Sequence, residues 1–290
     1  MHNKRLKNNA ILLLSCLDQK GIVAGISGFI YSHNGNIVHA EQHTDIESGM
    51  FFMRVEWELK GFQIPRAEIP KVFAPVARGF DMKWDLRFTD HIPKMAIFVS
   101  KHDHCLYEIL LRHKAGELAA EIPLIISNHP DLRSIAKAFG IEYRIFPVNK
   151  KNKANVEKQE LEILKQYQIE LIVLARYMQI LSPEFVAHFP NRIINIHHSF
   201  LPAFAGPRPY HQAREKGVKL IGATSHYVTE ELDVGPIIEQ DVIRVSHRDS
   251  VEDLIKKGRE IEKLVLARAV KLHLENRVLV YENKTVVFDR

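Results

Sequence analysis

The chain has 290 residues, of which 46% are apolar and 26% are charged, so it can bury a sizeable core and does not belong to the disordered class. Forty basic against thirty-five acidic residues give a net charge of +5 without a dense basic block. This balance argues against a nucleic-acid-binding protein and fits small anionic ligands.

The two cysteines, Cys16 and Cys105, form no CxxC pair, which argues against a disulfide framework and against a cysteine-based zinc site. The apolar run near the N-terminus ends at Asp18 without a cleavage site, and no run approaches the roughly 20 apolar residues that span a bilayer. We therefore expect a cytoplasmic protein that does not bind membranes.

The first ninety residues predict a small α+β domain. Apolar residues predict a strand over 11–17, and helical spacing of apolar residues predicts a helix within 21–35. Two strands, 36–45 and 49–59, form a predicted hairpin, and a weaker helix over 66–80 and a strand over 82–90 follow. The order β-α-β-β-α-β is that of the ferredoxin-like fold.

The opening of this domain resembles a known regulatory module. Residues 17–37, LDQKGIVAGISGFIYSHNGNI, are similar to the start of an ACT domain. In that family an acidic residue and a glycine after the first strand open a ligand-facing loop, and Asp18 and Gly21 match them here. The resemblance implies that residues 1–90 bind an amino-acid effector and pair across subunits, so we expect a homo-oligomer. The alternative is an unrelated α+β dimerisation module.

The remainder, residues 91–290, predicts an α/β domain. Strands over 95–100, 122–128, 142–146 and 171–176 alternate with helices over 105–116, 131–140 and 156–168. Such alternation predicts a parallel sheet with helices on both faces, whose ligand crevice lies outside the carboxyl ends of the strands. At the end of the chain, residues 276–290 predict a hairpin around Glu282 and Asn283, with no role that the sequence specifies.

Three polar residues form a candidate catalytic set. Asn195 and His197 lie two positions apart at the end of the predicted strand RIINI, so their side chains point to one side. The prolines and Gly206 of the following LPAFAGPRP predict a rigid loop closing over the site. Asp233 lies in a predicted turn before Gly235. An amide, an imidazole and a carboxylate suit attack on a small carbonyl, because they can stabilise an oxyanion and move protons.

The remaining histidines and Cys105 have alternative interpretations that assign them no catalytic role. His198, His211 and His226 are interpreted as structural histidines. A zinc site would need several convergent histidines, but His197 and His198 point to opposite sides of a strand and no HExxH motif occurs, so we expect no bound metal. Cys105 at a helix start could be a nucleophile, but attack by water needs no covalent step.

The motifs NIHHSFLPAFAG and HYVTEELDVGPIIEQ resemble the signature of folate-dependent formyltransferases, whose fold is a Rossmann-like, mostly parallel sheet. The resemblance implies catalytic roles for Asn195, His197 and Asp233 on a formyl group carried by 10-formyltetrahydrofolate. It implies that the folate is the substrate and that no cofactor is needed. By the same resemblance the folate is bound by six further residues: Met178, Gln179, Ile180, Leu181, Thr229 and Glu230.

The loop after the first strand of this domain bears on the acceptor of the formyl group. Glycinamide ribonucleotide formyltransferases carry a glycine-rich, phosphate-binding loop there, but FVSKHDHCLYEIL has no glycine. Water is then the expected attacker. This loop, NIHHSFLPAF and RPYHQA together resemble the formyltetrahydrofolate deformylase family, which pairs an ACT domain with a formyltransferase-like domain. The resemblance implies hydrolysis to tetrahydrofolate and formate, which supplies formate for purine synthesis and balances one-carbon pools. The alternatives are a formyltransferase with an amine acceptor and a non-catalytic folate sensor.

Overall fold

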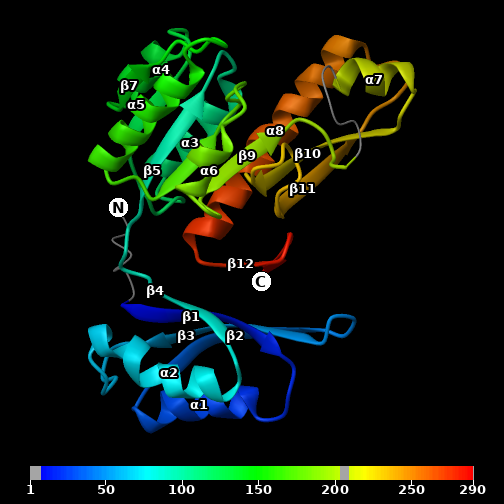
Figure 1. Ribbon diagram of the computed structural model, residues 1–290. Coiled ribbons are helices and arrows are strands. Elements are labelled where there is room, and N and C mark those ends of the chain that lie inside the picture. Colours follow the sequence, from blue (N-terminus) through cyan, green and yellow to red (C-terminus); the bar gives the residue numbers. More distant parts are fainter. Residues whose placement is uncertain (1–7, 203–208, 290) are drawn as a thin grey trace. The chain divides into compact units, whose positions relative to one another are not determined.

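The computed structural model describes residues 8–202 and 209–289, and its chain divides into two compact units (Figure 1). One unit contains the chain up to Ile92 together with Glu275–Leu279 and the segment from Val286 onward. The other contains Pro93–Leu274 and Val280–Thr285. Most of the predicted proline-rich loop, residues 203–208, lies outside the described residues.

The first unit has the predicted β-α-β-β-α-β order. Its elements are β1 (Asn9–Leu17), α1 (Ile22–Ser32), β2 (Asn36–Asp45), β3 (Met50–Glu58), the 3₁₀ turn η1 (Arg66–Glu68), α2 (Ile69–Gly79) and β4 (Lys83–Phe88). The strands form one antiparallel sheet in the order β2-β3-β1-β4. The predicted ferredoxin-like fold is therefore confirmed.

The core of this unit follows from the apolar periodicities. Alternate residues of β1, Ala10, Leu12 and Leu14, pack with the buried side of α1, where Ile26 and Ile30 are fully buried. Alternation along a strand and four-residue spacing along a helix each present one apolar face, so the two faces close on each other.

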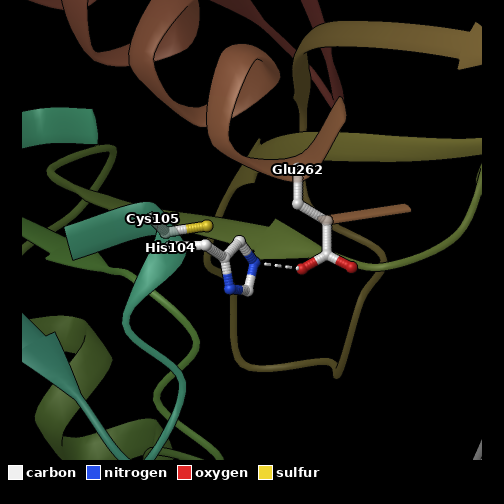
Figure 2. A group of neighbouring side chains, drawn as sticks. All are labelled: His104, Cys105 and Glu262. Atoms are coloured by element: carbon white, nitrogen blue, oxygen red, sulfur yellow. Dashed lines mark hydrogen bonds and ion pairs between the residues drawn. The ribbon is translucent and has the colours of Figure 1, made fainter. Parts of the chain in front are cut away.

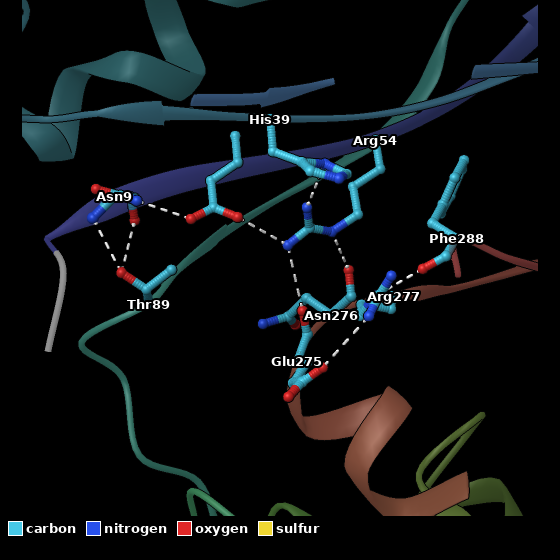
Figure 3. A network of polar contacts seen from close by, with 9 residues as sticks. Asn9, His39, Arg54, Thr89, Glu275, Asn276, Arg277 and Phe288 are labelled. Atoms are coloured by element: carbon cyan, nitrogen blue, oxygen red, sulfur yellow. Dashed lines mark hydrogen bonds and ion pairs between the residues drawn. The ribbon is translucent and has the colours of Figure 1, made fainter. Parts of the chain in front are cut away.

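C-terminal residues complete the first unit, as Figure 3 shows. Arg54 of β3 is 5% exposed; its Nε donates to the carbonyl of Asn276 at 3.0 Å, and its Nη2 to that of Glu275 at 3.4 Å. Arg277 donates to the carbonyl of Phe288 at 2.6 Å, and the Phe288 N–H returns a bond to the Arg277 carbonyl at 2.9 Å. A buried arginine thus satisfies carbonyl groups at the point where the chain leaves its last helix.

The second unit is built on a seven-stranded sheet in the order β11-β10-β9-β8-β5-β6-β7. Its strands are β5 (Lys94–Val99), β6 (Glu121–Ser127), β7 (Glu142–Ile145), β8 (Leu171–Leu174), β9 (Ile193–His197), β10 (Leu220–Tyr227) and β11 (Ile237–Arg244). The five strands from β5 to β9 run parallel, whereas β10 runs antiparallel to β9 and β11 antiparallel to β10. The predicted mostly parallel sheet is confirmed.

Six helices accompany this sheet in the described residues: α3 (His104–Lys114), α4 (Arg133–Ala138), α5 (Lys153–Gln166), α6 (Pro183–Ala187), α7 (Pro209–Glu215) and α8 (Val251–Leu274). The apolar periodicity predicted α3, α4 and α5, whereas α6, α7 and α8 were not predicted from the sequence. The 24-residue α8 packs against α3, β9, β10 and β11. After α8, β12 (Val278–Tyr281) and β13 (Lys284–Val287) form the predicted C-terminal hairpin. Within the described ranges, no helix is both long and apolar enough to cross a membrane.

The strand order places the candidate site. From β5 the chain continues to β6 and β7 on one side, and then returns to β8 and β9 on the other. In a parallel sheet such a reversal opens a crevice at the carboxyl ends of the strands. His104 follows β5, Arg176 follows β8 and His197 ends β9, so all three residues emerge at this edge.

Candidate active site

Asn195 and His197 project from β9, the last parallel strand of the sheet. In the ladder between β9 and β10, Asn195 lies opposite His226 and His197 lies opposite Thr224. The side chain of His197 is 7% exposed. Two positions along a strand bring side chains to the same face, so the amide and the imidazole share one face as predicted.

Asp233 lies in the turn between β10 and β11, and its backbone is left-handed with φ 57°. The turn is closed by a bond from the Tyr227 N–H to the Pro236 carbonyl at 2.9 Å. Gly235 passes so close to the Tyr227 carbonyl that a Cβ atom there would lie 1.8 Å from the oxygen. The local sequence therefore needs glycine at 235, and aspartate is one of the few residue types that tolerate the left-handed conformation at 233.

The turn brings Asp233 to the histidines of the sheet. Asp233 Oδ2 lies 3.2 Å from His197 Nδ1, and Asp233 Oδ1 lies 3.6 Å from His226 Nε2. His226 Nε2 is also 3.2 Å from the Asn195 side-chain nitrogen. The structure thus unites Asn195, His197 and Asp233, and adds His226, which the sequence analysis left as structural. The strand register that sets His226 opposite Asn195 is a long-range feature that no local motif reveals.

The electrostatics of this group favour an ionised carboxylate. The hydrogen bond with His197, and then that with His226, lower the pKa of Asp233 well below its usual range, although partial burial acts in the opposite direction. His226 Nδ1 lies 2.9 Å from the Tyr227 carbonyl, and its Nε2 atom faces Asn195 and Asp233.

The Nε2 nitrogen of His197 is buried and has no hydrogen-bond partner among the described residues. Because Asp233 occupies the Nδ1 side, Nε2 is the atom available to a reacting molecule. An imidazole oriented by a carboxylate and open at its second nitrogen is suited to proton transfer.

A second buried polar cluster adjoins the first. The rings of His198 and His197 lie 5.2 Å apart, and those of His198 and Tyr210 lie 6.2 Å apart. Burial, followed by the charge of Arg176, lowers the pKa of His198 to about 4, so this imidazole is neutral at physiological pH. The Tyr210 hydroxyl donates a hydrogen bond of 2.6 Å to Glu262 Oε1 of α8, which links His198 and Tyr210 to Glu262.

Glu262 is the centre of this second cluster. Its Oε2 atom lies 2.8 Å from His104 Nε2 and 3.4 Å from Arg176 Nε. Burial alone would raise the pKa of Glu262, but the His104 hydrogen bond and the Arg176 charge outweigh it and lower the pKa to about 2. Gly258, one turn earlier on α8, makes room for the Tyr210 hydroxyl, which lies 2.0 Å from where a Cβ atom would be. Sequence reasoning missed these partners because α8 itself was not predicted.

Among the described residues, His104, Cys105 and Glu262 are the group whose ligand atoms could surround a metal ion, since these atoms lie within 4.8 Å of one another (Figure 2). Two features oppose that use. Burial raises the pKa of the Cys105 thiol well above its usual value, which disfavours the thiolate that binds metals. The guanidinium of Arg176 already neutralises Glu262. The cluster is therefore a buried ion-pair network.

The six residues assigned to folate binding lie on two segments. Met178–Leu181 follow β8, and Met178 donates its N–H to Ser100 Oγ at 3.0 Å. Met178 and Ile180 are 56% and 59% exposed, whereas Leu181 is buried. Thr229 and Glu230 lie in the same turn as Asp233. Val228, next to Thr229, packs on the apolar cluster that contains Leu181, so both segments border one core.

The mostly parallel sheet carries the Asn-His-Asp group at its carboxyl edge. Comparisons with known proteins identify the family to which this domain belongs. The formyl transferase family matches residues 93–270, and the ACT domain family matches residues 10–57. The chain is thus a formyl transferase-type domain preceded by an ACT domain.

Individual relatives narrow the family further. Formyltetrahydrofolate deformylases of Synechocystis sp. and Bacillus subtilis are 60% and 54% identical over 279 residues, which cover 96% of this chain and 98% and 93% of theirs. A crystal structure of a formyltetrahydrofolate deformylase from Pseudomonas syringae superposes with a TM-score of 0.95 at 47% identity, covering 99% of this chain and 96% of that one. Glycinamide ribonucleotide transformylase 1 from Symbiobacterium toebii reaches a TM-score of 0.64 at 30% identity, covering 71% of this chain and 98% of that one. The chain belongs to the formyltetrahydrofolate deformylase family.

Proposed function

We propose that the protein hydrolyses 10-formyltetrahydrofolate to tetrahydrofolate and formate, with Asn195, His197 and Asp233 as its catalytic residues. The observation that carries this proposal is the placement of His197, whose Nδ1 atom faces the Asp233 carboxylate at 3.2 Å while Nε2 is buried without a partner in the described residues. Membership in the deformylase family supports the same reaction.

The reaction proceeds through a tetrahedral intermediate. Water attacks the formyl carbon while Asp233 and His197 take up its proton. The amide of Asn195 and an N–H of His197 stabilise the negative charge that develops on the formyl oxygen. Collapse breaks the bond between the formyl carbon and the folate nitrogen, and the imidazole returns a proton to that nitrogen. The products are formate and tetrahydrofolate, and no metal or redox cofactor takes part.

His226 extends this catalytic set as a positioning residue. Its Nε2 atom lies 3.2 Å from the Asn195 amide nitrogen and 3.6 Å from Asp233 Oδ1, so it limits the movement of both groups. Met178, Gln179, Ile180, Leu181, Thr229 and Glu230 bind the folate. The exposure of Met178 and Ile180, together with the shared core beneath both segments, supports this assignment.

Residues 1–90 act as the regulatory domain and residues 91–290 as the catalytic domain. The match to the ACT family supports binding of a small-molecule effector, for which we propose an amino acid at the loop from Asp18 to Gly21. Gly21 has φ 95°, a conformation that suits a glycine-dependent loop. The protein forms a homo-oligomer, and the exposed apolar residues Ile37 and Val38 of β2 support this. The formate supplies purine synthesis and the reaction balances one-carbon pools.

The test is formate release from 10-formyltetrahydrofolate without any added amine. We expect wild-type turnover, and a loss of about 100- to 10,000-fold in kcat for Asp233→Asn, which is the usual range for a lost acid–base group. Asp241→Asn is the matched control, because Asp241 pairs with Arg268 at 2.9 Å on the surface of β11 and has no catalytic role. Release that requires an amine acceptor would instead establish a formyltransferase. Folate binding without release under either condition would establish a sensor.

A further inference from the structure

Apolar packing contributes little at Asp233 itself, although Gly235 and Pro236 of the same turn are buried. Leu232 and Val234, on either side of Asp233, are 59% and 50% exposed. Asp233 itself has a left-handed backbone, which is costly for a residue other than glycine unless its surroundings hold it. The carboxylate must nevertheless stay within hydrogen-bonding reach of His197, so other contacts have to fix the turn.

The tip of the C-terminal hairpin supplies two such contacts. Asn283 Nδ2 donates to the Val234 carbonyl at 2.8 Å, directly after Asp233. The Thr285 hydroxyl donates a short hydrogen bond to the Ile237 carbonyl, where β11 begins. Val234 and Ile237 lie on the two sides of the Gly235-Pro236 segment, so the hairpin holds this segment at both ends.

The hairpin is itself well held, as a support must be. Its strands β12 and β13 pair with each other, and Glu282 takes up the left-handed conformation of its turn with φ 50°. Thr285 and Asn283 therefore belong to a paired hairpin rather than to an unpaired chain end.

We propose that the C-terminal hairpin is a positioning element for the reaction, in which Asn283 and Thr285 hold the Asp233 turn so that the carboxylate stays aligned with His197. This inference rests on the proposed function. It gives a role to a segment that lies about fifty residues beyond Asp233 in the sequence. Both residues act through the backbone of the turn and do not contact the substrate.

The test compares four variants of the full-length protein. Each of the two hydrogen bonds is partly exposed to water, so a single loss should have a small effect and a double loss a larger one. We expect kcat to fall about 3-fold in Thr285→Val and about 10-fold or more in the double variant Asn283→Ala/Thr285→Val. Thr285→Ser, which keeps the hydroxyl, should restore wild-type kcat. Lys284→Ala is the matched control within the same hairpin, since its side chain is exposed, and should match the wild type.

Hydrogen exchange separates positioning from general damage to the fold. Amide hydrogen exchange over residues 229–237 should become faster in the double variant but not in Lys284→Ala, because the hairpin contacts hold the backbone of this turn. Thermal unfolding of every variant reports whether the fold is retained.

The outcomes are distinguishable. If the wild type releases formate and the folded double variant keeps wild-type kcat, the positioning role is wrong. If Thr285→Ser is as slow as Thr285→Val, the hydroxyl is not the active feature and the inference also fails. If the wild type releases no formate, the proposed function fails, and the hairpin is then judged by hydrogen exchange alone. Unchanged exchange over 229–237 in the double variant would overturn the inference in that case as well.

Discussion

Replacing Gly235 with alanine is a sharp test of how the Asp233 turn supports catalysis. The new Cβ atom would lie 1.8 Å from the carbonyl oxygen of Tyr227, and real Cβ contacts are essentially never shorter than 3.0 Å. The opposing atom belongs to the backbone of β10, so it cannot move away as a flexible side chain could. The turn must therefore move by about 1.2 Å, the difference between these two distances.

A displacement of this size determines the expected loss of rate. Misplacing a catalytic group by about 1 Å can lower the rate about 100-fold. Asp233 lies two residues before Gly235, and its carboxylate is 3.2 Å from His197 Nδ1, so a shift of the turn breaks this hydrogen bond. We expect kcat of Gly235→Ala to fall about 100-fold in the protein that remains folded.

The assay is steady-state formate release, with thermal unfolding measured in parallel. Gly28→Ala in α1 is the matched control, because its Cβ would meet nothing within 4 Å. This control should keep wild-type kcat and gain about 0.4–1 kcal/mol of stability from the lower entropy of the unfolded chain. A folded Gly235→Ala enzyme with kcat within a few-fold of the wild type would refute the reasoning.

Two buried carboxyl groups give further predictions, in which the pH dependence of stability has opposite signs. Glu262→Gln leaves the Arg176 guanidinium buried without its counter-ion and should lower the free energy of unfolding by about 3–5 kcal/mol at neutral pH. The pKa of Glu262 is lowered from 4.5 to about 2 in the folded state. The stabilisation by the ionised carboxylate is therefore present above pH 4.5 and is lost as the pH falls towards 2. Urea unfolding at several pH values tests this. Burial raises the pKa of Glu160 from 4.5 to about 8 despite the Tyr177 hydrogen bond. The wild type should therefore lose up to about 5 kcal/mol of stability as the pH rises from 4.5 to 8, and Glu160→Gln should not; an equal decline in both would contradict the assignment.

Periodicity and motif spacing were sufficient for much of this protein. Alternation along 11–17 and four-residue spacing after Gly21 predicted the first strand and helix, because each element buries only one face. The strand ending at His197 placed Asn195 and His197 on one side, because the period of a strand is two residues. The resemblance of two motifs to formyltransferases added Asp233, which the structure brings to His197. These features are local or belong to short motifs, so a single sequence reveals them.

Only the tertiary structure decided which distant residues complete the site. His226 gained its place from the antiparallel register of β9 and β10, and Glu262 from the packing of α8 beside α3. The hairpin contact from Asn283 joins residues 49 positions apart. Each of these pairings depends on loops and helices that bring remote segments together, and a side chain's identity does not show which partner it will meet. Burial also sets the pKa values of two side chains. The pKa of His198 is lowered and that of Glu160 is raised because folding removes both groups from water.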